Sequence, residues 1–229
     1  MAIETTYFTG TTAAANYAEV SAWLTVNAVD YFDTIDVPSG GQEVNCKVGD
    51  VTALKLDWGT DYDAQRSFQV TAKNGANINS GYRYVHNKCC WRYGYKTDSG
   101  IVISNGKTDN YQASIFISKN NNGELIFAVL KPDSPNSTNP SNWAEIIDFN
   151  SLASVKSNES SQADPATRHR INGVIPTSMT ALVPIVSDVE TYCDKIMITP
   201  FSQYNNMCWG VIDVSGTKYV YNGVFALKE

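Results

Sequence analysis

An alternation of apolar and polar residues dominates this sequence and constrains its fold more than any other feature. Val44, Cys46 and Val48 alternate with polar neighbours, and the clearest alternation runs from Tyr111 to Ser118. Successive side chains of a β-strand point to opposite faces, so this period of two is typical of strands with one buried face. Short strands separated by turns that contain Gly and Asn predict a mainly β fold, an antiparallel β-sandwich or a jelly-roll-like arrangement.

Two places combine strands with strong turn signals. The polar run 119–124 separates the alternating strand from Leu125–Leu130, which is apolar on both faces and predicts a hairpin whose second strand is central in its sheet. Near the C-terminus, Ser215-Gly216 and Asn222-Gly223 separate three apolar strands. Because these residue pairs tolerate positive φ, residues 207–229 are predicted to form a three-stranded meander.

One stretch has helical spacing. Its apolar residues recur at intervals of four, three and four residues: Ala13, Tyr17, Val20 and Leu24. With Thr11 or Thr12 as the N-cap, this spacing predicts a short helix over about residues 13–28. The β-branched Thr25 and Val26 would also suit a strand, so the sequence leaves both structures open at the end of this stretch.

The middle of the chain is poor in residues that form a core. Residues 131–142 contain three prolines among Ser, Thr and Asn, and residues 150–170 are mostly polar. We therefore expect a polar loop segment over about residues 131–172, exposed or ordered by a partner. With an N-terminal arm and helix over about residues 1–36 and no internal repeat, the chain is predicted to be a single β-rich domain, residues 1–229.

Charge and hydropathy exclude several classes of protein. Seventeen basic and 23 acidic residues give a net charge of −6, which does not favour nucleic-acid binding. The longest uninterrupted apolar run, Leu125–Leu130, is too short for a transmembrane helix. Because no signal peptide is recognisable at the N-terminus, we expect synthesis in a cytosol.

The cysteines predict structural thiols rather than a disulfide framework, because their number is odd and they are widely spaced. They are Cys46, Cys89, Cys90, Cys193 and Cys208. His86 could form a catalytic pair with Cys89 or Cys90, or these residues could contribute ligands to a zinc site. On a strand the pair would lie about 10 Å apart, and no Cys-x-x-Cys completes a zinc site. An ordinary polar histidine near buried thiols is favoured.

The acidic residues give no specific catalytic or metal-binding signal. Asp61 and Asp63 resemble the start of an EF-hand loop, but Arg66 stands where the loop needs Gly and Ala72 where it needs Glu. A looser cluster of these acids with Asp57 is less favoured than solvated loop residues. Pairs of acids at glycosidase spacing cannot be recognised from sequence. We therefore predict no enzymatic activity, no metal and no cofactor.

A run of aromatic residues is the one candidate for ligand or partner binding. With a period of two, Trp91, Tyr93 and Tyr95 would share one face of a strand, opposite Arg92 and Lys96. Aromatic rings stack on sugars and anchor protein interfaces. They also fill cores, and packing is the favoured interpretation of this face.

Three segments in the last part of the chain resemble the ends of tail-associated virion proteins of phages and prophages of gut Firmicutes. These segments are Met179–Ile185, Met197–Tyr204 and Lys218–Leu227. The resemblance covers residues 179–229 and consists of turns and apolar strands, so no catalytic residue is carried over. It implies a non-enzymatic particle component, in a symmetric ring or trimer, assembled in the cytoplasm of a bacterial host.

Three functions follow as hypotheses. The first is a tail-associated virion structural protein that binds itself and neighbouring virion proteins through apolar anchors and sheet edges. The second is a carbohydrate-binding module that recognises a host surface glycan through Trp91, Tyr93 and Tyr95. The third, a glycan depolymerase, would need two carboxylates facing each other across a cleft.

Overall fold

The computed structural model describes thirteen stretches of the chain. They are residues 2–39, 42–58, 66–71, 73, 79–85, 91–105, 113–132, 142–150, 154–157, 183–186, 192–198, 210–222 and 225–229. The described strands form three sheets, and every pairing within them is antiparallel. The mainly β, antiparallel fold class is therefore confirmed.

The central sheet has seven strands and is apolar on both faces. In sheet order these are β1 (Glu4–Tyr7), β7 (Tyr93–Lys96), β8 (Gly100–Ser104), β9 (Ser114–Lys119), β10 (Leu125–Pro132), β11 (Asn142–Asp148) and β12 (Ser154–Ser157). All five residues of β8 and residues 114–118 of β9 are buried. A sheet of this composition must be covered on both sides.

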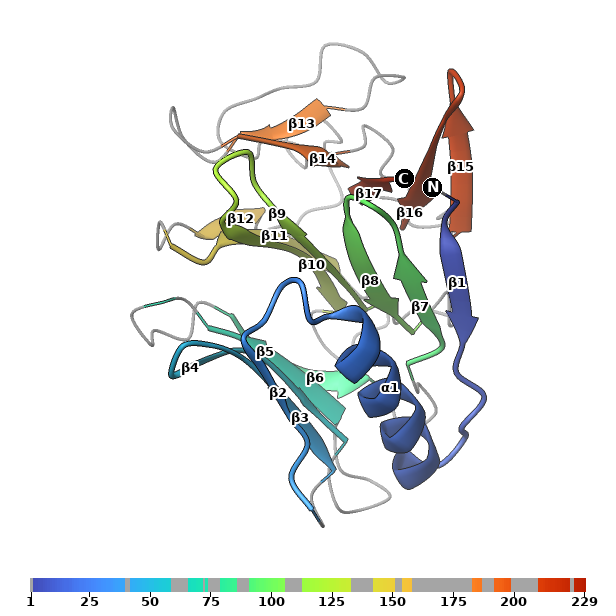
Figure 1. The fold of residues 1–229 in the computed structure, drawn as a ribbon, viewed down its shortest axis with the longest axis vertical. Coiled ribbons are helices and arrows are strands. Elements are labelled where there is room, and N and C mark those ends of the chain that lie inside the picture. Colours follow the sequence, from blue (N-terminus) through green and yellow to red (C-terminus); the bar gives the residue numbers. More distant parts are fainter. Residues whose placement is uncertain are drawn as a thin grey trace.

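An N-terminal sheet of five strands covers one face of the central sheet (Figure 1). Its order is β2 (Thr34–Asp36), β3 (Glu43–Val48), β4 (Val51–Asp57), β5 (Arg66–Val70) and β6 (Asn79–Val85). The alternating residues Val44, Cys46, Leu54 and Leu56 are fully buried against that face. Their polar neighbours point outward, as the period of two predicts.

Helix α1 (Ala13–Asn27) packs into the same core as the N-terminal sheet. The Thr12 hydroxyl caps the helix by accepting a hydrogen bond from the Ala15 N–H at 3.1 Å. Val20, Trp23 and Leu24 are its buried apolar residues. A Cβ atom at Gly94 would lie 2.6 Å from the Trp23 ring, so a glycine in β7 lets the helix approach the sheet. The predicted helix is confirmed and ends at Asn27.

A C-terminal sheet of five strands covers the other face of the central sheet (Figure 1). Its order is β13 (Val183–Val186), β14 (Tyr192–Ile198), β17 (Phe225–Lys228), β16 (Thr217–Tyr221) and β15 (Gly210–Val214). Phe225 and Leu227 are buried in one core with Phe116 and Ile126 of the central sheet. The predicted hairpin (β9–β10) and the predicted meander (β15–β16–β17) are both confirmed.

The described parts of two predicted segments contain strands that the sequence did not indicate. Residues 131–172, expected to be a polar loop segment, contain the end of β10 and the strands β11 and β12. β11 pairs with β10 along its whole length, and this tertiary pairing outweighs the polar and Pro-rich sequence that surrounds the strand. The N-terminal arm, residues 1–36, likewise contains β1 and β2, which pair into two different sheets.

Candidate functional site

The outermost strands of the three sheets differ in how well their free edges are protected. Natural sheets protect an edge with Lys, Pro, a bulge or a very short strand. Among the described strands, β12 contains Lys156, β13 contains Pro184 and a register shift, β6 contains Arg83, and β2 has three residues. In contrast, β1 and β15 contain no Lys, Arg or Pro, and each has a single acid, Glu4 or Asp213. We call β1 and β15 the open edges.

The bonding pattern of β1 can be derived from one hydrogen bond. The Phe8 N–H donates to the Arg92 carbonyl oxygen at 2.9 Å, one residue beyond the Tyr7–Tyr93 pair. In an antiparallel ladder, hydrogen-bonded pairs alternate with pairs whose N–H and C=O groups point away from the partner. Thr6 is therefore bonded to β7, and the backbone groups of Thr5 and Tyr7 point to the outer side of the sheet.

The segment that joins β1 to α1 holds the strand in place. The Glu19 carboxylate accepts hydrogen bonds from the Gly10 N–H at 2.9 Å and from the Thr9 hydroxyl at 2.8 Å. The Gly10 bond is the main cause of a lowered Glu19 pKa. A guanidinium nitrogen of Arg92 donates to the Gly10 carbonyl at 3.3 Å. A Cβ atom at Gly10 would lie 2.5 Å from the Asn16 nitrogen, so this turn requires glycine.

In β15, the tight turn that follows the strand determines which backbone groups are free. Ser215 and Gly216 have φ values of 55° and 86°, as in the type I′ turn of a two-residue hairpin. The Asp213 carboxylate stabilises this turn by accepting from the Gly216 N–H at 2.8 Å. The pair that flanks such a turn is hydrogen-bonded, so the backbone groups of Val211 and Asp213 point to the outer side.

Each open edge also carries an exposed apolar side chain. Tyr7 is 67% exposed and Val211 is 48% exposed. The Tyr7 ring lies edge-on to Tyr93 at 5.0 Å, and Tyr93 is stacked on Tyr95 at 6.0 Å. Tyr7 is thus the exposed end of an aromatic row that leads into the core. Both open edges lie at the right-hand side of the view in Figure 1.

The predicted face of Trp91, Tyr93 and Tyr95 does not exist as one face. Trp91 precedes β7 and is 2% exposed, with its ring 6.1 Å from Phe68 in the core on the helix side. Tyr93 and Tyr95 point to the opposite core, where Tyr95 is 4% exposed and Tyr93 half-buried. The period of two is broken because Trp91 lies before the strand begins. Trp91 and Tyr95 therefore have no ring face open to a sugar.

A buried amide that the sequence did not indicate explains the position of Trp91. The Asn16 side chain, fully buried on α1, donates to the Trp91 carbonyl at 2.7 Å. Its oxygen accepts from the Trp91 N–H at 3.1 Å and from the Trp58 indole N–H at 3.0 Å. One side chain thus joins the helix, the end of β4 and the segment before β7. A polar residue on an otherwise apolar helix face is the only local signal of this role.

The two described cysteines, Cys46 and Cys193, are buried free thiols, in agreement with the structural role predicted for them. Burial raises the pKa of Cys46 to about 12 and also raises that of Cys193. Both thiols are therefore protonated at neutral pH. Several residues considered as reactive or metal-binding lie outside the described part of the chain: Asp61, Asp63, His86, Cys89, Cys90 and Cys208.

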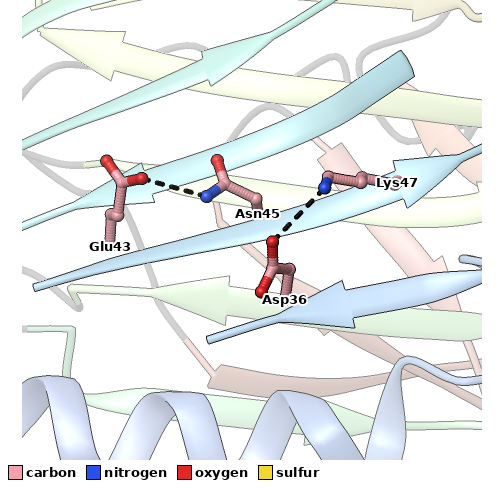
Figure 2. A network of polar contacts seen from close by, with 4 residues as sticks. All are labelled: Asp36, Glu43, Asn45 and Lys47. Carbon is pink, nitrogen blue, oxygen red and sulfur yellow. Dashed lines mark hydrogen bonds and ion pairs between the residues drawn. The ribbon is translucent and has the colours of Figure 1, made fainter. Parts of the chain in front are cut away.

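Charged side chains gather on the outer face of the N-terminal sheet (Figure 2). Asn45 donates to Glu43 at 3.1 Å, and Lys47 pairs with Asp36 at 3.3 Å. Lys55 pairs with Glu43 at 2.5 Å, and this bond is the main cause of a lowered Glu43 pKa. Glu43 and Asp36 are thus each paired with a lysine of the same face.

The described residues contain no group of three or more His, Cys, Asp or Glu side chains placed to hold a metal ion. Within the same residues, α1 is too short and too polar to cross a membrane. Comparison with known proteins finds no family model and no curated protein that matches this chain. The open edges, together with the exposed Tyr7 and Val211, are the candidate functional site.

Proposed function

We propose that this chain is a non-enzymatic structural protein of a phage virion, associated with the tail. It acts by binding further copies of itself and neighbouring virion proteins, and it is assembled in the cytoplasm of the bacterial host. The observation that carries the proposal is the pair of open edges, β1 and β15, each with outward backbone groups and an exposed apolar side chain. Unprotected edges of this kind pair with strands of other chains.

The C-terminal sheet gives the proposal a second support. The three segments that resemble tail-associated proteins contribute residues to β13, β14, β16 and β17 of this sheet. Its inner face packs on the central sheet, and its outer face is also apolar. The residues of that outer face are Met197, Ile212, Val214, Tyr219, Tyr221 and Ala226. Tyr219, Tyr221 and Ala226 are at most 8% exposed, so this face belongs to a further buried cluster of the chain and the contacts proposed here are made by the open edges.

Two buried side-chain amides, those of Asn16 and Asn222, hold layers of the fold together. Asn16 bonds to two tryptophans from different sheets, as described above. Asn222 plays the same part on the other side, since its amide donates to the Ser114 hydroxyl of β9 at 2.6 Å. Its oxygen accepts from the Phe225 N–H at 2.7 Å. This use of buried amides supports a framework role.

Sedimentation velocity over a wide range of protein concentration tests the proposal. We expect a concentration-dependent oligomer, with ordered assemblies in negative-stain electron micrographs and the chain present in purified particles. A monomer at every concentration, absent from particles, would contradict the proposal. Binding to a host surface glycan that Tyr7→Ala abolishes would instead support the receptor-binding alternative, moved from Trp91 and Tyr95 to the exposed Tyr7 and the half-buried Tyr93.

A further inference from the structure

We infer that β1 pairs antiparallel with β1 of a second copy, with Thr5 opposite Thr5, so that the central sheets of the two copies become one continuous sheet. This inference rests on the proposed function, because it identifies the surface through which the chain binds itself. A two-fold axis through the pair of Thr5 residues relates the copies, as in most homodimers.

The backbone of β1 is suited to this pairing. Thr5 and Tyr7 direct their N–H and C=O groups away from β7, as derived from the Phe8–Arg92 bond. Ile3 is the residue before β1 and packs against the core cluster that contains Tyr95, so extending the alternation by two residues from Thr5 directs its backbone groups outward as well. In the proposed register these three residues meet their counterparts as hydrogen-bonded pairs, Thr5 with Thr5 and Tyr7 with Ile3. Every outward group of the strand then has a partner.

The side chains of β1 complement each other in the same register. Tyr7 is the most exposed aromatic side chain of the described residues for which exposure is given, and it would lie against the half-buried Ile3 of the second copy. Aromatic and β-branched residues form favourable cross-strand pairs. Glu4 would lie opposite Thr6, so the pairing places no like charges directly opposite each other. A register centred on Thr6 would leave Tyr7 opposite Thr5 and the Ile3 backbone unpaired.

The other open edge is less suited to pairing with its own copy. In β15 the outward groups belong to Val211 and Asp213, and the symmetric register centred on Ile212, the middle of the strand, would place these two residues opposite each other. The exposed Val211 would then face a carboxylate instead of an apolar side chain. Self-pairing therefore favours β1, and β15 serves as a matched control.

The variant Thr5→Pro tests the inference without disturbing the chain's own bonds. Because the Thr5 N–H points outward, a proline there removes no hydrogen bond within the chain and is tolerated at an edge. The control, Val211→Pro, likewise removes only an outward N–H. We expect Thr5→Pro to weaken dimerisation by about a hundredfold in sedimentation experiments, through loss of two symmetric backbone bonds and a clash of the rings. Val211→Pro should dimerise like the wild type.

Circular dichroism and thermal unfolding confirm first that both variants fold. If the wild type is a monomer at all concentrations, the self-association in the proposed function fails and this inference fails with it. If the wild type associates and Thr5→Pro associates equally well, only the pairing of β1 is overturned. Dissociation by Val211→Pro alone would overturn it as well and assign the contact to β15.

Cysteine cross-linking tests the register. Thr5→Cys would place two sulfurs on directly opposite residues, with Cα atoms about 5.5 Å apart, a separation that a disulfide spans. Mild oxidation with diamide should then convert the dimer to a covalent form on a non-reducing gel. Glu4→Cys, one residue away and on the other face, should stay at the level of the wild type. Equal cross-linking of both variants would overturn the proposed register.

Discussion

The N-terminal and C-terminal sheets cover opposite faces of the same central sheet but differ on their outer faces. Outside the N-terminal sheet, lysines pair with acids of neighbouring strands, as at Lys55–Glu43 and Lys47–Asp36. Outside the C-terminal sheet, Tyr219 and Tyr221 lie with aliphatic side chains on a face that points away from the central sheet. One sheet thus presents a charged surface, whereas the other is apolar on both of its faces.

Both sheets bury an apolar inner face against the central sheet. The difference between them shows that this burial leaves the outer face of each covering sheet free to be charged or apolar. A charged outer face interacts well with water and resists non-specific association. The apolar outer face belongs to a further buried cluster, since Tyr219, Tyr221 and Ala226 are at most 8% exposed. The comparison therefore shows that the outer face of the N-terminal sheet carries ion pairs, whereas that of the C-terminal sheet is covered within the chain.

The largest expected effect is on the free energy of unfolding. It comes from replacing the two buried asparagines that join the covering layers to the central sheet. Asn16→Ala leaves two buried N–H groups and a carbonyl without their partner, each loss costing about 1–3 kcal/mol, so we expect about 4 kcal/mol less stability. Asn222→Ala removes the bonds to Ser114 and Phe225 and should cost about 2 kcal/mol. Urea unfolding measures both. A larger loss for Asn222→Ala would reverse the comparison.

Truncation of one leucine in each core tests whether the two halves unfold together. Leu56 and Leu227 are both fully buried, on the N-terminal and C-terminal sides of the central sheet. Replacing either with Ala should cost about 3 kcal/mol. For the single domain predicted from the sequence, calorimetry should show one transition that both variants shift downward. A second transition, moved only by Leu227→Ala, would show that the C-terminal sheet unfolds separately.

The two buried thiols can report on local opening of the two halves. Cys46 lies on β3 and Cys193 on β14, and each of these strands is next to an outermost strand, β2 or β13. With the other three cysteines replaced by Ser, we expect a thiol reagent to label Cys193 about tenfold faster than Cys46, since a register shift at Pro184 interrupts the pairing of β14 with β13, whereas β3 and β2 pair without one. Equal rates in urea provide the control. Faster labelling of Cys46 would place the less stable half at the N-terminus.

The smallest effect concerns the charged outer face of the N-terminal sheet. Lys55 and Asn45 lower the Glu43 pKa, so the unfolded carboxyl takes up protons at a higher pH than the folded one. The stabilisation is therefore complete above the ordinary pKa of 4.5 and is lost as the pH falls through the lowered pKa. Glu43→Gln should cost less than about 1 kcal/mol at pH 7, and less at pH 3 than at pH 7.

Urea unfolding at the two pH values measures this difference. A double-mutant cycle with Lys55→Met separates the ion pair from other effects of the substitution. A loss as large at pH 3 as at pH 7 would show that the contribution of Glu43 is not electrostatic.

The elements predicted correctly from the sequence are those with local signals. Thr12 and the spacing of Val20 and Leu24 define the helix, and Ser215-Gly216 defines a hairpin turn, because capping and positive φ depend on a few neighbouring residues. The strands β11 and β12 were missed because Pro and polar residues dominate the sequence around them, and they form through the pairing of β11 with β10 and of β12 with β11. The prediction of a shared face for Trp91 and Tyr95 failed for a related reason, since Asn16 binds the backbone of Trp91.

The open edges could not have been identified from sequence. Whether Glu4–Tyr7 is an outermost or an inner strand depends on the order of strands in the sheet, which places it beside residues 93–96, far along the chain. The composition of β1, with its isolated acid and exposed Tyr7, becomes informative only when that position is known. Among the predicted candidates, Tyr93 alone lies in the aromatic row that reaches this edge without being fully buried.

The protection of only one end of the central sheet limits the shape of any assembly built from it. With both broad sides occupied by other layers, such a sheet can be extended only sideways, through β1 or through β12. The sequence of β12 contains Lys156, a residue type that disfavours pairing at a free edge, so the proposed pairing through β1 would end the growth of the sheet. A two-fold contact of this kind gives closed pairs of central sheets instead of open-ended fibres.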